Sequence, residues 1–174
     1  RQVYNFASSY CAADWLTGDG WLDCPGDSDD QRGSAILLED PDLESRQEDE
    51  LGLWTRPNVH PNGWISGYYP PFLIRRGDTF QAEIGCMDRR RDCEVLFRLD
   101  YQDERGDVHP LGVWEEVYDG ETSEILVNLS FLDGEVVEFV LSVNNIGDPE
   151  DADAIWFLPR IESPGSEGRL VLFW

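Results

Sequence analysis

The sequence predicts an all-β protein built from antiparallel strands. Short apolar or alternating runs recur between turn signals, a pattern typical of a β-sandwich or a β-barrel, and helical periodicity is nearly absent. The 174 residues suffice for one domain with a hydrophobic core and are too few for two ordinary domains. A composition that is 41% hydrophobic and 12% aromatic is that of a folded protein, not of a disordered chain.

The expected strands are separated by segments with turn chemistry, such as Gly18–Gly20, Cys24–Asp27 and Arg75–Asp78. A short helix is expected at Ser130–Leu132, just before an Asp-Gly pair. The expected strands are Val3–Ser8, Ser34–Glu39, Leu51–Thr55, Trp64–Tyr68, Phe72–Arg75, Thr79–Gly85, Glu94–Tyr101, Gly112–Tyr118, Glu124–Asn128, Val136–Val143, Ala154–Ile161 and Arg169–Trp174.

Alternation along the strands indicates which side chains enter the core. In Thr79–Gly85 and in Glu94–Tyr101 every second residue is apolar, which is typical of a strand with one buried and one solvated face. The stretch Val136–Val143 is apolar on both faces for part of its length, which favours a central strand. The side chains expected to face the core are Phe80, Ala82, Ile84, Val95, Phe97, Leu99 and Tyr101.

Four cysteines fall into two local pairs, Cys11 with Cys24 and Cys86 with Cys93. Their even number and close pairing favour two local disulfides, each stabilising the fold by roughly 2–3 kcal/mol in the chain-entropy model. Other connectivities and a four-cysteine zinc site remain alternatives, although neither pair has the C-x2-C spacing of zinc ligands. Disulfides predict an oxidising location, which is secreted, on a cell surface or periplasmic. The start at Arg1 is expected to be that of a processed chain.

Charge excludes several classes of partner. The chain has 13 basic residues, all of them arginine, against 36 acidic ones, for a net charge of -23. Nucleic acid and anionic membrane surfaces require clustered cations, so neither is expected as a partner. The absence of lysine excludes Schiff-base chemistry and a P-loop, and no apolar run is long enough to span a membrane.

Several short motifs resemble a known group of modules. They are YNFASSYCAADW at the start, Leu53–Trp54, the YPPF element Tyr69–Phe72, RRGDTFQAEIGC and AIWFLPRI. Together they resemble secreted bacterial jelly-roll modules, similar to the galactose-binding-like and NPCBM-type carbohydrate-binding families, over roughly Val3–Ile161. The resemblance implies an antiparallel jelly-roll-like sandwich of about eight or more strands. It also implies a structural calcium ion and sugar binding through aromatic platforms.

No catalytic constellation stands out. The only histidines, His60 and His109, both precede proline in loop-like contexts, and no nucleophile-elbow or zinc-protease motif is present. A glycosidase carboxylate pair is an alternative that carries little weight, because 36 acidic residues always supply some pair. The protein is therefore expected not to be an enzyme.

Two acidic loops could supply the oxygen ligands that calcium prefers. Neither follows the EF-hand pattern, and the competing interpretation is that both are solvated turns. The candidate calcium ligands are Asp27, Asp29, Asp30, Asp148, Glu150, Asp151 and Asp153.

Sugar binding would need exposed aromatic rings beside polar groups. A Gly/Pro/Asn-rich region and the segment beside the first cysteine pair supply such rings, although core packing is the competing interpretation for each. The candidate sugar-binding residues are Trp54, Trp64, Tyr68, Tyr69, Trp15 and Trp21.

The resembling modules end at the strand that matches Ile161, but this chain continues with a linker, 162–168, and an apolar strand, 169–174. Both faces of that strand are apolar, so it requires burial against a sheet edge or groove. We therefore predict a secreted subunit that self-assembles into a filament by donating this strand to another copy. The alternative is a monomeric carbohydrate-binding module whose partner is a polysaccharide. The assembly-strand residues are Leu170, Val171, Leu172, Phe173 and Trp174.

Overall fold

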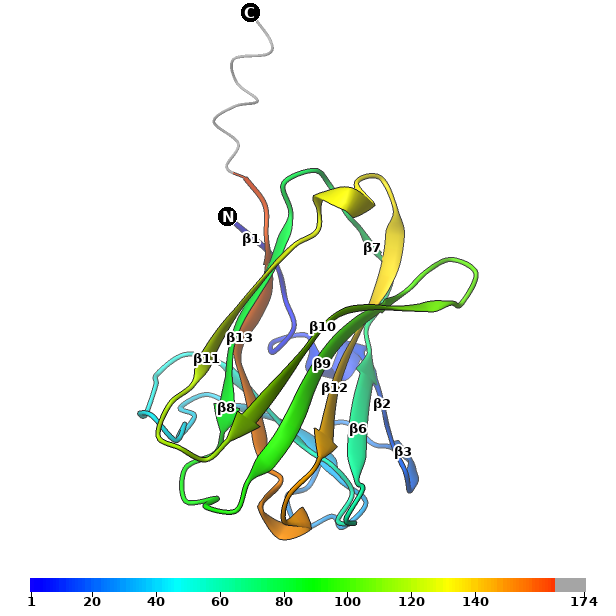
Figure 1. Ribbon diagram of the computed structural model, residues 1–174. Coiled ribbons are helices and arrows are strands. Elements are labelled where there is room, and N and C mark those ends of the chain that lie inside the picture. The colour runs from blue at the N-terminus through cyan, green and yellow to red at the C-terminus, as the bar shows by residue number, and fades with distance from the viewer. Residues whose placement is uncertain (165–174) are drawn as a thin grey trace, which may run out of the picture.

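The computed structural model describes residues 1–164. Two antiparallel sheets pack face to face in a sandwich (Figure 1), which confirms the predicted all-β fold class. The predicted strand 169–174 and most of the predicted linker lie outside the described residues. Among the described residues, no helix is long and apolar enough to cross a membrane.

Sheet 1 contains six strands: five lie in the order β11–β8–β13–β5–β4, and β1 pairs with β13. Every pairing in it is antiparallel. The strands are β1 (Gln2–Asn5), β4 (Ser34–Leu38), β5 (Gly52–Arg56), β8 (Thr79–Cys86), β11 (Ser123–Asn128) and β13 (Ala154–Glu162).

Sheet 2 has the order β10–β9–β12–β6–β2–β3, and β7 pairs with one end of β12. As predicted, β12 lies in the interior of its sheet, between β9 and β6. The strands are β2 (Asp14–Thr17), β3 (Gly20–Leu22), β6 (Trp64–Tyr68), β7 (Phe72–Leu73), β9 (Glu94–Gln102), β10 (Val108–Val117) and β12 (Val136–Asn145). Three single-turn 3-10 helices complete the described chain: η1 (Tyr10–Ala12), η2 (Ser130–Leu132) and η3 (Pro149–Asp151).

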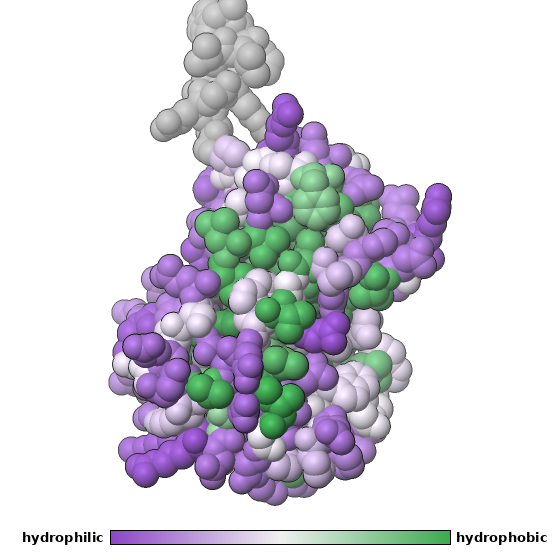
Figure 2. Space-filling view, in the orientation of Figure 1, coloured by the Kyte–Doolittle hydropathy of each residue, from purple (hydrophilic) through white to green (hydrophobic). Residues whose placement is uncertain are grey.

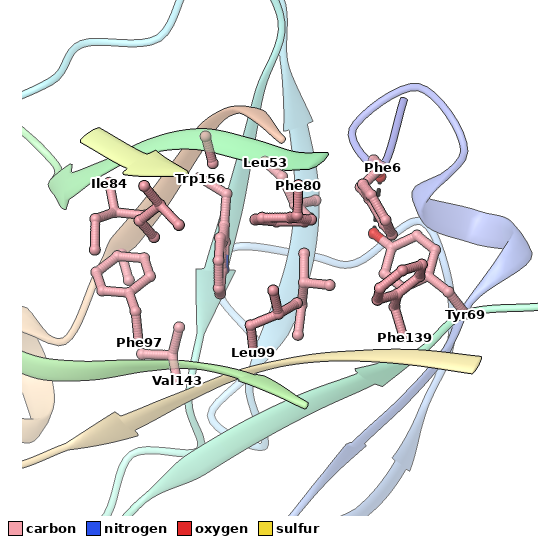
Figure 3. Close-up of a cluster of buried hydrophobic side chains, with 14 of the residues drawn as sticks. Phe6, Leu53, Tyr69, Phe80, Ile84, Phe97, Leu99, Phe139, Val143 and Trp156 are labelled. Atoms are coloured by element: carbon pink, nitrogen blue, oxygen red, sulfur yellow. Dashed lines mark hydrogen bonds between the residues drawn. The ribbon is translucent and has the colours of Figure 1, made fainter. Parts of the chain in front are cut away.

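The core fills the space between the two sheets. Trp156 of β13 is fully buried, and its ring meets Phe97 of β9 edge to face at 5.0 Å. Figure 3 shows Trp156 standing between Phe97 and Phe80, with Phe6, Tyr69 and Phe139 forming a second aromatic group. All of the predicted inward side chains except the half-buried Tyr101 are buried, so alternation identified the core faces of β8 and β9 correctly.

Both predicted disulfides are present, Cys11–Cys24 and Cys86–Cys93. The first brackets the hairpin formed by β2 and β3, and the second joins the end of β8 to the residue before β9. The zinc alternative is therefore wrong, because all four sulfur atoms are in disulfide bonds.

The β2–β3 hairpin was not expected from the sequence, where its residues read as a Trp/Gly-rich loop. It pairs with β6 and extends sheet 2 by two strands. Strand β10 also begins at Val108, earlier than predicted, so the β9–β10 hairpin is longer.

The two outer faces of the sandwich differ. Leu43, from the loop between β4 and β5, is buried against Ile155 and Phe157 on the outer face of sheet 1. Arg46 of the same loop lies over the Phe157 ring at 5.7 Å. Figure 2 shows apolar residues gathered in the middle of the view, within a polar periphery. Among the exposed apolar residues are Val113 of β10 and Leu126 of β11. The outer face of sheet 2 carries the hollow described next.

Candidate functional site

The outer face of sheet 2 is built by strand alternation. On β6, Ile65 and Gly67 face the core, while Trp64, Ser66 and Tyr68 face outward. Gly67 is required there, because a Cβ atom at this position would lie 2.5 Å from the ring of the buried Trp15. The outward residues of β6 therefore lie on a strand whose inward residues are packed in the core.

The strand register places small side chains in a row across the sheet. Ser66 of β6 lies opposite Ser142 of β12 and Leu16 of β2, and Ser142 lies opposite Arg98 of β9. The hydroxyl groups of Ser66 and Ser142 are hydrogen-bonded at 2.7 Å. Short side chains in the middle of this row leave a depression that runs across the strands.

Larger residues form the two banks of the depression. On one bank Trp64 lies opposite Asn144, and on the other Tyr68 lies opposite Val140, which in turn lies opposite Asp100. The result is a groove of about 180 Å³, here called the sheet 2 groove. Its lining residues are Trp64, Ser66, Tyr68, Arg98, Asp100, Val108, Val140, Ser142 and Asn144.

A third ring continues the aromatic surface beyond the groove. Trp21 of β3 pairs with Leu16 of β2 and is 63% exposed. Its ring centroid lies 6.2 Å from that of Tyr68. Aromatic side chains therefore extend from the groove toward the outer edge of the β2–β3 hairpin.

Charged groups in the groove are incompletely paired. Asp100 is only 7% exposed, and among residues 1–164 nothing donates a hydrogen bond to its carboxylate. Burial raises the pKa of Asp100 above its ordinary value, and the positive charge of Arg98 opposes this rise. Arg98 Nε lies 4.0 Å from Asp100 Oδ2, and the Arg98 side chain is 45% exposed. Both groups thus retain hydrogen-bonding capacity toward a ligand.

The structure brings three of the six sequence-predicted sugar candidates together, namely Trp64, Tyr68 and Trp21. Trp15 and Tyr69 are buried, with Trp15 Nε1 donating to the Tyr10 carbonyl and the Tyr69 hydroxyl donating to the Phe6 carbonyl. Neither buried ring has a face free for a ligand, so the prediction that Trp15 and Tyr69 contact a sugar is wrong.

Trp54, the remaining candidate, lies on β5 in sheet 1. Its Nε1 donates a hydrogen bond of 2.9 Å to Asp153, so the structure places it apart from the sheet 2 groove.

Sequence reasoning missed the polar residues of the groove: Ser66, Arg98, Asp100, Ser142 and Asn144. Alternation in β9 placed Arg98 and Asp100 on the solvated face, which is the one signal that could have singled them out. The two serines carry no comparable signal, because their importance depends on the register between strands.

The first acidic loop uses its carboxylates to order its own turns. Asp27 accepts a hydrogen bond from the Asp29 backbone, and Asp30 forms an ion pair with Arg32. The Arg32 hydrogen bond lowers the pKa of Asp30. These carboxylates already have partners within the loop.

The second acidic loop is similarly engaged. Asp148 accepts from the Glu150 backbone, and Asp151 accepts from the backbone of Asp92. Asp153 is buried and binds Arg90 at 2.6 Å. Within the described part of the chain, no three acidic, histidine or cysteine residues are grouped to hold a metal ion. Calcium binding stays a sequence-based prediction.

One carboxyl group has a strongly shifted pKa, and it lies away from the groove. Burial, with the charges of Glu44 and Asp119 adding to it, raises the pKa of Glu116 to about 7. Glu116 is on β10 and is 5% exposed, whereas its outward neighbours on that strand, Glu115 and Val117, are exposed. It therefore has no access to a ligand in the sheet 2 groove.

No family model matches the chain, and no curated protein matches it. The chain does match solved structures. The carbohydrate-binding module TmCBM61, solved with β-1,4-galactotriose, gives a TM-score of 0.54 at 9% identity over 94% of this chain and 99% of that one. An exo-β-agarase gives 0.54 at 12% identity over 94% of this chain and 25% of that one. The CBM22-1–GH10 modules of Clostridium thermocellum xylanase 10B, solved with xylohexaose, give 0.51 at 13% identity over 93% and 28%.

At these identities the comparisons establish the fold. The chain has the β-sandwich fold of carbohydrate-binding modules, in agreement with the resemblance found in the sequence motifs.

Proposed function

We propose that this domain is a non-catalytic carbohydrate-binding module that holds a polysaccharide chain in the sheet 2 groove. The observation that carries the proposal is the arrangement of Trp64 and Tyr68 on opposite banks of a floor formed by Ser66 and Ser142. Open aromatic faces beside unpaired polar groups fit a ligand with apolar ring faces and many hydroxyl groups. The fold shared with carbohydrate-binding modules supports the same function.

Each part of the groove has a role in this proposal. The C–H faces of the sugar rings pack on Trp64 and Tyr68, and Trp21 adds a contact beyond Tyr68. Sugar hydroxyl groups donate to the Asp100 carboxylate and accept from the Arg98 guanidinium. A ring that anchors such a ligand costs about 2 kcal/mol or more when truncated to alanine, roughly a 30-fold loss of affinity.

The charge of the chain favours an uncharged ligand. A net charge of -23 repels sulfated or uronic acid polymers, and the groove itself supplies one carboxylate for one guanidinium. The proposed ligand is therefore a neutral polysaccharide.

Native affinity electrophoresis of the full chain in gels containing xylan, β-1,4-galactan or agarose tests the proposal. We expect retardation in at least one gel and its loss in the double variant Trp64→Ala, Tyr68→Ala. Phe131→Ala is the matched control, because Phe131 is 67% exposed on η2 and is not a groove residue. Retardation that survives the double variant, or equal loss in the control, contradicts the proposal.

The filament hypothesis receives no support from these observations. The comparisons favour the carbohydrate-binding alternative, and the strand on which assembly depends lies outside the described residues. Strand donation therefore stays a prediction from the sequence. The two disulfides support an oxidising compartment, and we propose an extracellular location.

A further inference from the structure

A second hollow lies on the opposite face of sheet 2 from the groove. It has a volume of about 500 Å³ and lies between the β9–β10 hairpin and the start of β12. Tyr101 and His109 lie opposite each other in the hairpin and line this hollow, whereas Asp100 and Val108, one residue earlier on each strand, line the sheet 2 groove. Because side chains alternate along a strand, one face of this hairpin lines the sheet 2 groove and the other face lines the hollow.

The hollow contains a fixed aromatic surface. The rings of Tyr101 and His109 are stacked with centroids 4.9 Å apart and planes inclined by 24°. Asp103 Oδ2 lies 2.7 Å from His109 Nε2, and the backbone amides of Arg105 and Asp107 donate to Asp103 Oδ1. The His109 side chain remains 43% exposed. Its orientation is therefore set before any ligand arrives, which lowers the entropic cost of binding.

Polar groups around these rings are free to bind a ligand. Among residues 1–164, the Tyr101 hydroxyl makes no hydrogen bond and Glu104, Arg105 and Glu135 form no ion pair. Burial raises the pKa of Tyr101, with Glu135 and Asp103 adding to the rise, so the phenol stays a hydrogen-bond donor at neutral pH. The hollow thus offers a ring face, donors and acceptors within one concave space.

We propose that this hollow is a second saccharide-binding site, taking a short neutral oligosaccharide unit against the His109–Tyr101 stack. Its volume lies within the usual range for small-ligand sites, about 300–1,000 Å³. Arg105 donates to sugar hydroxyl groups, and Glu104 and Glu135 accept from them. The proposal extends the proposed function to a separate face and requires no residue of the sheet 2 groove.

Amide chemical-shift mapping of the full chain tests this site, with β-1,4-galactotriose and xylohexaose as probes. We expect one set of shifts around Trp64 and Tyr68 and a separate set around Tyr101, His109 and Glu135. Calorimetry should show a second binding event per chain. His109→Ala should abolish the second set and leave the first, while Trp64→Ala with Tyr68→Ala should do the reverse.

The outcomes separate the two proposals. Shifts confined to the groove, with calorimetry unchanged by His109→Ala, overturn the second site and leave the proposed function standing. Shifts confined to the hollow support the second site and contradict the groove. If His109→Ala disturbs the hairpin, Arg105→Ala and Glu135→Gln replace it as the test, because both residues line the hollow. Each of these variants should weaken the second binding event several-fold. Full binding in both of these variants overturns the proposal, and probes that shift neither face contradict both sites.

Discussion

The hydroxyl groups of Ser66 and Ser142 lie 2.7 Å apart and share a hydrogen bond across β6 and β12. Each serine is less than a tenth exposed, and one hydroxyl donates to the other, so the floor of the groove is formed by two short side chains held together by this hydrogen bond. Depth in the groove therefore depends on two small residues that come from distant parts of the sequence.

Filling the floor should abolish ligand binding without unfolding the protein. In Ser142→Leu the added side chain projects into the sheet 2 groove, so we expect at least a tenfold loss of affinity in calorimetry. Ser142→Ala is the control, because it removes the hydrogen bond, at about 1 kcal/mol of stability, and leaves the space open. Wild-type affinity in Ser142→Leu would contradict the groove.

Binding should weaken in acid through Asp100. Burial raises the pKa of Asp100, so this carboxylate gains a proton at a higher pH than an exposed aspartate and then no longer accepts hydrogen bonds with both oxygens. We expect affinity to fall as the pH is lowered from 7 toward 4. Asp100→Asn should bind more weakly at pH 7 and show a flatter pH profile. An identical profile in the variant would exclude Asp100 as the titrating group.

Stability should have a separate pH dependence that arises from Glu116. Its pKa is raised to about 7 in the folded protein against an ordinary value of 4.5, so between these values the folded state holds a proton that the unfolded state has lost. The free energy of unfolding therefore falls as the pH rises through this window, by up to about 3 kcal/mol.

Glu116→Gln should remove this fall, and denaturant unfolding at pH 4.5, 6 and 8 measures it. The other carboxyl groups of this acidic chain contribute their own pH dependence, so the informative quantity is the difference between wild type and variant. A difference that does not change with pH would be inconsistent with a titrating Glu116.

The two disulfides should have different effects on binding. Cys11–Cys24 brackets the hairpin that carries Trp21, whereas Cys86–Cys93 lies at the ends of β8 and β9. Replacing either pair with alanine should cost about 2–3 kcal/mol of stability. Only the Cys11→Ala, Cys24→Ala variant should also weaken binding, as measured by calorimetry below both melting temperatures. Equal affinity in the two variants would show that the hairpin contributes nothing to the site.

The apolar segment 169–174 gives a prediction that rests on the sequence alone. If strand donation drives assembly, deleting Gly168–Trp174 should convert polymers into a folded monomer, and Leu172→Asp with Trp174→Asp should do the same. Size-exclusion chromatography and negative-stain microscopy measure this. A full-length chain that is monomeric at all concentrations tested would rule out self-assembly, and carbohydrate binding should be unchanged by the deletion.

Strands of five or more residues were largely predictable because each has enough residues to display its pattern. The bounds of β6 match the prediction, and those of β8 and β9 differ from it by one residue at one end. The ten-residue β10 is an exception, because it begins at Val108 and not at the predicted Gly112. The β2 and β3 strands have four and three residues around a Gly-Asp-Gly turn, too few to separate a strand pattern from a loop.

The site was less predictable than the fold. Trp64, Tyr68 and Trp21 were among the candidates because aromatic residue types are conspicuous in a sequence, and their role in sugar binding stays a prediction. Trp15 and Tyr69 belong to the same residue types and sit beside them, so composition could not distinguish a buried ring from an exposed one. The pairing of Ser66 with Ser142 depends on which strands are neighbours and in what register, and neither is readable from a single chain.

Alternation along β6 also has a consequence for protein engineering. Ile65 and Gly67 are committed to the core, with Gly67 held against Trp15, while Trp64 and Tyr68 contact the core little and face the groove. A combinatorial library that varies 64, 68, 100 and 144 and keeps 65 and 67 constant should therefore consist largely of folded members. Selection from such a library on different glycans would yield a set of reagents with one scaffold and many specificities.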